Sequence, residues 1–212
     1  MSIKITPPEV ETYLKQLYDE GDPVQHEMEA MARDRKFPIV GPVCGRHLYQ
    51  LAQLIGARRV FELGSGYGYS ALFFSRAVGE DGQVHCTELD QRNINLAKGF
   101  LSRAGVWSRV TYHKQEATEA LRQTGGTWDI IYNDIGKEAY PAVIELAYQH
   151  LRPGGLFISD NVLWSGRVFD GQHDDSASTR AIVEFTQQLF NHPGFSTTIL
   201  PVRDGLSVAL RV

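Results

Sequence analysis

The sequence VFELGSGYGYS at residues 60–70 constrains the fold more than any other part of the chain. A short apolar run leads into Glu62, passes through the alternating glycines Gly64, Gly66 and Gly68, and continues into residues that suit a helix. Glycine tolerates positive φ angles and lets a backbone approach a ligand closely. The segment predicts a strand, a binding loop and a helix in succession, although an ordinary structural turn has a similar composition.

The acid in this segment separates two classes of ligand. A carboxylate at the strand tip repels a phosphate, so Glu62 argues against a nucleotide-phosphate loop. It favours a ligand with a cationic group and hydroxyls, such as S-adenosylmethionine (SAM). The dinucleotide fingerprint is G-x-G-x-x-G, whereas the third glycine of this chain comes one residue early.

Size and charge narrow the function classes. The 212 residues suit one domain, which we divide into a helical cap at 1–56 and a Rossmann-like core at 57–212. A formal net charge of -4 and a pI near 6.0 argue against nucleic acid as a partner. We expect a cytoplasmic protein without membrane association, because the chain carries two dispersed cysteines, no signal peptide and no apolar stretch of about 20 residues.

Periodic apolar residues predict the order of the elements. Helical spacing predicts helices near 8–20, 24–34, 48–55, 93–104 and 138–150. Short apolar runs predict strands near 58–63, 83–88, 109–113, 128–134 and 155–160. Such alternation indicates a mostly parallel sheet with helices on both faces. The runs 195–201 and 206–210 flank Asp204-Gly205 and predict an antiparallel hairpin, so the expected fold is an α/β, doubly wound, seven-stranded Rossmann-like sheet closed by that hairpin.

Ligands of an open α/β sheet bind beyond the carboxyl ends of the strands. The second strand ends in Glu88, whose two oxygens can accept both ribose hydroxyls of an adenosine. The alternative role for Glu88 is that of a helix N-terminal acid, which Asp90 fills better. The third strand leads to Glu116 and Ala117, where a contact to an adenine edge would fall.

Oxygen ligands follow the fourth and fifth strands. Asp134 ends the fourth strand, and Asp160 and Asn161 end the fifth. Two carboxylates and an amide oxygen suit Mg²⁺ or another hard divalent ion. A turn after the strand explains the Asp160-Asn161 pair equally well from spacing alone. The seven histidines are dispersed, with His173 in an acidic segment that suggests a mobile loop, and neither a zinc cluster nor a Ser-His-Asp set can be assembled.

Four segments together resemble one enzyme family. They are FELGSGYGYS at 61–70, NDIGK at 133–137, DNVLWSGRV at 160–168 and LPVRDG at 200–205. This set resembles the cation-dependent class I O-methyltransferases, which include catechol and caffeoyl-coenzyme A O-methyltransferases and small bacterial relatives. The resemblance covers nearly the whole chain from Pro8 onward.

The resemblance implies roles for individual residues. The residues that would bind SAM are Val40, Glu62, Gly64, Ser65, Ser70, Glu88, Ala117 and Asp134. Those that would hold the divalent cation, Mg²⁺, Mn²⁺ or another, are Asp134, Asp160 and Asn161. Lys137 and Asp134 would be catalytic, with Lys137 beside the acceptor hydroxyl. Trp164 and the loop at 167–169 would form an acceptor lid, although core packing explains Trp164 equally well.

The chain departs from the family pattern at two positions. Gly136 stands where the family commonly has a second aspartate, and Asn133 is polar where relatives are usually apolar. We expect a magnesium-dependent methyl transfer from SAM to a small phenol with adjacent hydroxyls, in a homodimer. The alternatives are a nicotinamide-dependent oxidoreductase on a dinucleotide-binding fold and a non-catalytic SAM-binding protein.

Overall fold

The computed structural model describes residues 4–18, 21–169 and 174–212. Its sheet contains seven strands, which are β1 (Arg59–Leu63), β2 (Gln83–Thr87), β3 (Val110–His113), β4 (Trp128–Asn133), β5 (Leu151–Ser159), β6 (Phe195–Leu200) and β7 (Leu206–Arg211). Their order across the sheet is β3-β2-β1-β4-β5-β7-β6. The first five run parallel, and β7 pairs antiparallel with both β5 and β6. The predicted α/β sheet closed by a hairpin is confirmed.

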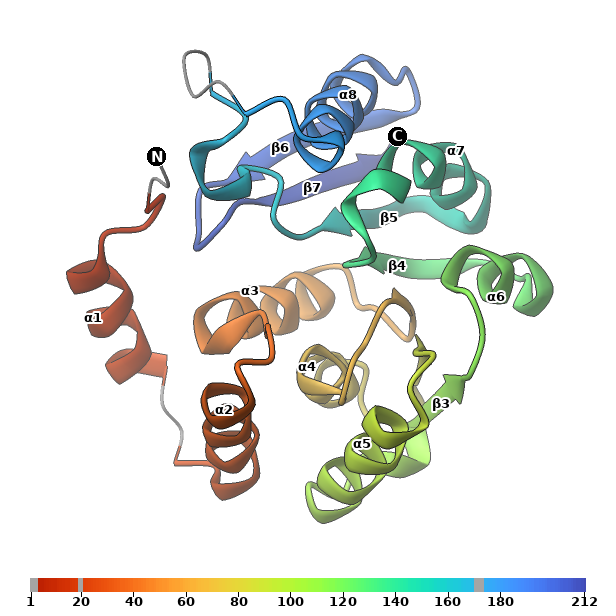
Figure 1. Ribbon diagram of the computed structural model, residues 1–212. Coiled ribbons are helices and arrows are strands. Elements are labelled where there is room, and N and C mark those ends of the chain that lie inside the picture. Colours follow the sequence, from red (N-terminus) through yellow and green to blue (C-terminus); the bar gives the residue numbers. More distant parts are fainter. Residues whose placement is uncertain (1–3, 19–20, 170–173) are drawn as a thin grey trace.

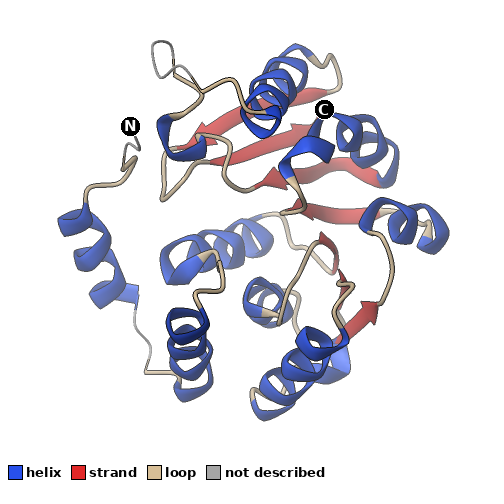
Figure 2. Cartoon of the chain, in the orientation of Figure 1, coloured by secondary structure: helices blue, strands red, loops and turns tan. Residues whose placement is uncertain are grey.

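Helices cover both faces of this sheet. The α-helices are α1 (Pro8–Tyr18), α2 (Pro23–Arg35), α3 (Gly41–Leu54), α4 (Tyr69–Ala77), α5 (Gln91–Arg103), α6 (Ala117–Thr124), α7 (Tyr140–His150) and α8 (Ala177–Asn191). Short 3-10 helices are η1 (Trp107–Arg109), η2 (Lys137–Ala139) and η3 (Trp164–Gly166). Figure 1 shows α3, α4 and α5 on one side of the sheet and α6, α7 and α8 on the other, and Figure 2 shows the same layers by element type.

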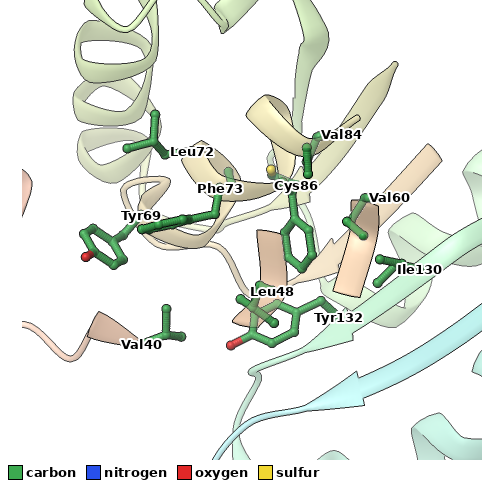
Figure 3. Close-up of a cluster of buried hydrophobic side chains, with 14 of the residues drawn as sticks. Val40, Leu48, Val60, Tyr69, Leu72, Phe73, Val84, Cys86, Ile130 and Tyr132 are labelled. Atoms are coloured by element: carbon green, nitrogen blue, oxygen red, sulfur yellow. The ribbon is translucent and has the colours of Figure 1, made fainter. Parts of the chain in front are cut away.

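The alternation of strand residues produces two buried clusters. In β1, Val60 packs with α3, α4 and α5, whereas Phe61 points to the opposite face and packs with α6, α7 and α8. Figure 3 shows the first cluster, where Val60, Ile130 and Tyr132 of the sheet lie beneath the helices. Burying side chains on both faces fixes the register of the parallel strands. The carboxyl ends of those strands are therefore held in one row.

The first two helices differ in how much of each is buried in the core. Helix α2 begins at Pro23 after the N-cap Asp22, whose carboxylate accepts the Val24 amide at 2.9 Å. It buries Met28 and Ala32 in the core. Helix α1 buries no residue and lies at the outer edge of the molecule (Figure 1). The predicted end of the first helix near Glu20 lies outside the described residues, as does His173.

Some predicted boundaries were wrong. Helix α3 begins at Gly41, not near Leu48, because Pro42 occupies the first turn of a helix, where its missing amide is not needed. Strand β5 begins at Leu151, four residues earlier than expected, since Leu151 pairs with Trp128 before the register shifts around Pro153 and Gly154. None of the helices among the described residues is long and apolar enough to cross a membrane.

Candidate active site

A cavity of about 540 Å³ opens at the carboxyl ends of β1, β4 and β5. The walls contain six of the predicted cofactor residues, which are Val40, Gly64, Ser65, Ser70, Glu88 and Asp134. They also contain the predicted catalytic and metal residues, which are Asp134, Lys137, Asp160 and Asn161. Residues more than 100 positions apart in the sequence are thus brought to one pocket, at the sheet edge where ligands of this topology bind.

The glycine loop needs glycine because the next strand end lies very close. Gly64 has a φ of 82°, and a Cβ there would lie 2.7 Å from the Asp134 carbonyl oxygen. The Gly64 amide donates to the Thr87 hydroxyl at 2.8 Å, and the Ser65 amide donates to the Thr87 carbonyl at 2.9 Å. The loop is therefore fixed between β2 and β4, with its backbone on the cavity.

Glu62 lies behind this loop and not in the cavity wall. It is fully buried and accepts hydrogen bonds from the hydroxyls of Ser65, at 2.8 Å, and Ser70. Burial raises the pKa of Glu62 to about 7. The carboxyl group thus positions two serines that do face the cavity. Ala117 begins α6 and is also absent from the wall, so a direct cofactor contact of either residue stays a prediction.

Glu88 lies in the cavity wall, just beyond the end of β2. One of its oxygens accepts the Asp90 amide at 2.7 Å. Asp90 caps α5 by accepting the Arg92 amide at 2.8 Å. Because Asp90 serves as the N-cap, the Glu88 carboxylate is not needed for that role and has acceptor capacity left for a ligand.

Asp160 and Asp134 lie in the same wall of the cavity. Asp160 is 2 % exposed, and burial, together with the charge of Asp134, raises its pKa to about 7. Its Oδ1 accepts the Asn161 amide at 2.8 Å. Asn161 adopts a φ of 61° and its carbonyl accepts the Trp164 amide, so this segment also forms a turn. The turn and the predicted ligand set therefore coexist.

The donor chemistry of this wall fits a hard divalent cation. Within the described ranges, no three His, Cys, Asp or Glu side chains gather into a metal cluster. A cation here would rest on Asp134, Asp160 and the Asn161 amide oxygen, with water or substrate in its other positions. Two nearby carboxylates in a poorly solvated wall repel each other, and a divalent cation would offset that cost.

Lys137 begins η2 and turns back toward β4. Its ammonium donates to Asp134 Oδ1 at 2.8 Å and to the Tyr140 hydroxyl at 2.7 Å. The side chain is 11 % exposed and lies 6.0 Å from the Trp164 ring centroid. Lys137 therefore pairs with the pocket acid and not with Glu138 or another surface carboxylate.

Trp164 lies both at the cavity and against the core, so its role as an acceptor lid stays a prediction. It lines the cavity and also packs against the cluster under α7 and α8. The Arg167 guanidinium lies 4.1 Å from its ring centroid. Asp204 holds this loop from the hairpin turn, since its carbonyl accepts the Leu163 amide at 2.9 Å and its carboxylate accepts the Ser165 amide. Phe169 lies further along the loop and is exposed.

The two departures from the family pattern have different surroundings. Gly136 lines the cavity, and a Cβ there would meet no heavy atom within 4 Å, so this part of the wall is open. Asn133 is fully buried, and its amide nitrogen donates to the Ser159 hydroxyl at 3.4 Å. Its side-chain oxygen has no hydrogen-bond partner among the described residues.

Two residues at or beside the cavity, Tyr140 and Arg203, were given no role from the sequence. Tyr140 donates to the Asp160 carbonyl at 3.0 Å while it accepts from Lys137, and so joins the fourth and fifth strand ends. Tyrosine on an apolar helix face indicates core packing, which hid this role. Arg203 lines the cavity from the hairpin turn. The LPVRDG segment contained the signal, but we interpreted it as a turn and as part of the family resemblance, and assigned no role to Arg203.

The sheet order, the closing hairpin and this cavity define a Rossmann-like methyltransferase. A family model described as O-methyltransferase matches residues 11–212. The catechol O-methyltransferase of Mycobacterium tuberculosis is 30 % identical over 96 % of both chains, and that of Niastella koreensis is 30 % identical over 81 % of both. The chain belongs to the O-methyltransferase family and is a SAM-dependent O-methyltransferase.

A solved structure supports the same assignment. The O-methyltransferase of Bacillus cereus, solved in complex with SAH, superposes with a TM-score of 0.87 at 27 % identity, covering 96 % of this chain and 97 % of that one. The family match decides against the nicotinamide-dependent oxidoreductase that the sequence left as an alternative.

Proposed function

We propose that this enzyme transfers the SAM methyl group to one of two adjacent hydroxyls of a small phenol, with Mg²⁺ or a similar divalent cation. The observation that carries the proposal is the cavity wall in which Asp134, Asp160 and Asn161 lie beside Lys137. The names of the M. tuberculosis and N. koreensis relatives support a catechol as the acceptor. The donor would occupy the part of the cavity between Gly64, Ser65 and Glu88.

The chain's own residues account for most of the steps. Glu88 would accept the donor's ribose hydroxyls, and the backbone of the glycine loop would approach its methionine part. Asp134, Asp160 and Asn161 would hold the cation, which, when bound, lowers the pKa of a hydroxyl that coordinates it. Lys137, after giving up one proton to solvent, would take the proton of the hydroxyl that attacks the methyl carbon; while it is an ammonium, it would stabilise the resulting phenolate. Trp164 would cover the acceptor and exclude water, which strengthens these charge interactions.

Positioning is the main contribution of such a site. The attacking oxygen is negative and the sulfonium is positive, and both charges are neutralised as the methyl group moves. A poorly solvated pocket favours that change, and holding the two reactants in line removes much of the entropic barrier. A cytoplasmic location and a homodimer remain parts of this proposal that need their own tests, by fractionation and by light scattering.

The test compares acceptors that differ in one hydroxyl. Purified enzyme with SAM and Mg²⁺ should methylate catechol, and phenol should give at least tenfold less product, measured by mass spectrometry of the ether. Chelation by EDTA should abolish turnover, and Mg²⁺ or Mn²⁺ should restore it. Equal turnover of phenol and catechol, or full activity after exhaustive chelation, would overturn the proposed chelation of adjacent hydroxyls.

A further inference from the structure

Arg203 places a positive charge in the cavity wall from the turn between β6 and β7. It lines the cavity together with Asp160, Asn161 and Trp164. The charge of Arg203 lowers the pKa of Asp160 more than the charge of Lys137 does. Burial and the charge of Asp134 raise the same pKa more strongly. Arg203 therefore shares the cavity wall with the proposed acceptor residues.

The backbone at Arg203 adopts a conformation that arginine rarely takes. Its φ is 51°, in the left-handed region that favours glycine, and its amide donates to the Thr6 hydroxyl at 2.8 Å. A left-handed non-glycine residue costs about 1 kcal/mol and such residues cluster at functional sites. Asn161, Trp164 and Ser165, in the neighbouring loop, share the left-handed conformation. Two strained segments thus meet at one wall of the cavity.

Within the described parts of the chain, the Arg203 guanidinium has no hydrogen-bond acceptor. Within those parts, no carboxylate lies within 4 Å of it, and no hydrogen bond from its side chain is formed. Other arginines that are partly buried do have such partners. Arg76 pairs with Asp22, and Arg152 pairs with Asp129. The cavity acids have other partners: Asp134 pairs with Lys137, and Asp160 and Glu88 each accept a backbone amide with one oxygen.

We propose that Arg203 recognises an anionic group on the acceptor, so that the preferred substrate is a dihydroxyphenol that carries a carboxylate. This inference rests on the proposed function, because it assigns the other end of the same acceptor. A half-buried guanidinium binds a carboxylate through two parallel hydrogen bonds with good geometric selectivity. The methionine carboxylate of SAM has the same chemistry. The position of Arg203 beside Asp160, Asn161 and Trp164 favours the acceptor over the donor.

The experiment uses 3,4-dihydroxybenzoate and its methyl ester, which differ in the charge and not in the reacting hydroxyls. For the parent enzyme, kcat/KM should be higher for the acid than for the ester. In Arg203→Gln this preference should fall by about 10- to 100-fold, the range expected for a charge-assisted pair. Arg203→Lys should retain part of the preference. Arg122→Gln removes a charge from an exposed residue of α6 and should keep the parent's acid-to-ester preference.

Three controls make the result decisive. Arg203→Gly relieves the left-handed backbone and should fold as well as the parent, so loss of preference in that variant cannot come from misfolding. An unchanged acid-to-ester preference in Arg203→Gln overturns the inference. Equal losses for acid and ester, together with weaker SAM binding in calorimetry, also overturn it and assign the guanidinium to the donor. If the parent methylates catechol but neither of these compounds, this inference is overturned. If it methylates none of the three, the proposed function fails, and calorimetry of the acid against the ester still tests Arg203.

Discussion

The ammonium of Lys137 lies 2.8 Å from Oδ1 of Asp134, and the two residues are joined as an ion pair at the edge of the cavity. The short 3-10 helix that begins at Lys137 turns the side chain back to the strand end just before it. The proposed proton-transfer residue and a proposed metal ligand are thereby held in direct contact. Removing the lysine leaves Asp134 without its counterion and removes the group proposed to handle the acceptor proton.

We therefore expect Lys137→Ala to lower kcat by about 10²- to 10⁴-fold, the usual contribution of a positioned acid or base. SAM binding, measured by calorimetry, should stay near that of the parent. Lys137→Arg should not restore the rate, because a guanidinium does not give up its proton usefully. Lys98→Ala, on the exposed face of α5, serves as the control. A Lys137→Ala enzyme within a few-fold of the parent rate between pH 6 and 9 would remove the proton-transfer role.

Glu88 provides the test of the donor site. Its carboxylate lies in the wall and retains acceptor capacity beyond the Asp90 amide. Glu88→Ala should weaken SAM binding by about 1–3 kcal/mol, the range of a hydrogen bond to a charged group, and should affect kcat at saturating SAM much less. Calorimetric titration with SAM measures the change. Glu119→Ala, an exposed acid on α6, is the matched control, and unchanged affinity in Glu88→Ala would contradict the ribose assignment.

The sequence predicted the parts of this fold that depend on local pattern. Alternating or continuous apolar runs identify buried strands, and Asp204-Gly205 between two such runs identified the hairpin. Strand-end acids such as Asp134 and Asp160 could be predicted to converge because parallel strands end in one row. Individual side-chain directions could not. Glu62 lies behind the cavity wall, where its carboxylate accepts from Ser65 and Ser70. Arg203 enters the wall through a left-handed turn, which composition does not encode.

Cation binding at Asp160 should depend on pH in a predictable direction. Its pKa is raised to about 7, chiefly by burial, so below that pH a cation must displace a proton. The affinity for Mg²⁺ should therefore fall by up to about tenfold when the pH is lowered from 7 to 6, and it should change little above pH 8. Calorimetry without acceptor measures this. Asp160→Asn should bind Mg²⁺ at least tenfold more weakly, whereas the exposed Asp81→Asn should not. A Mg²⁺ affinity that is constant from pH 6 to 8 would argue against Asp160 as a ligand.

Glu62 makes the stability of the enzyme pH-dependent. Burial raises the pKa of Glu62 from 4.5 to about 7. Between these values the folded protein keeps a proton that the unfolded chain has lost, so this group lowers the free energy of unfolding as the pH rises from 4.5 to about 7. Above that pH the full penalty is present, about 3 kcal/mol at about 1.4 kcal/mol per unit of pKa.

Glu62→Gln removes the titrating group but leaves an oxygen that can accept from Ser65 and Ser70. Both proteins are compared without SAM. The free energy of unfolding of the variant minus that of the parent should be about 1–3 kcal/mol larger at pH 8 than at pH 5, and urea denaturation at the two pH values measures it. Comparing the two proteins cancels the contribution of other groups such as Asp160. Glu80→Gln, an exposed acid in the turn before β2, should follow the parent at both pH values. Parallel stability curves for Glu62→Gln and the parent would mean that Glu62 is already ionised in the folded protein at pH 5.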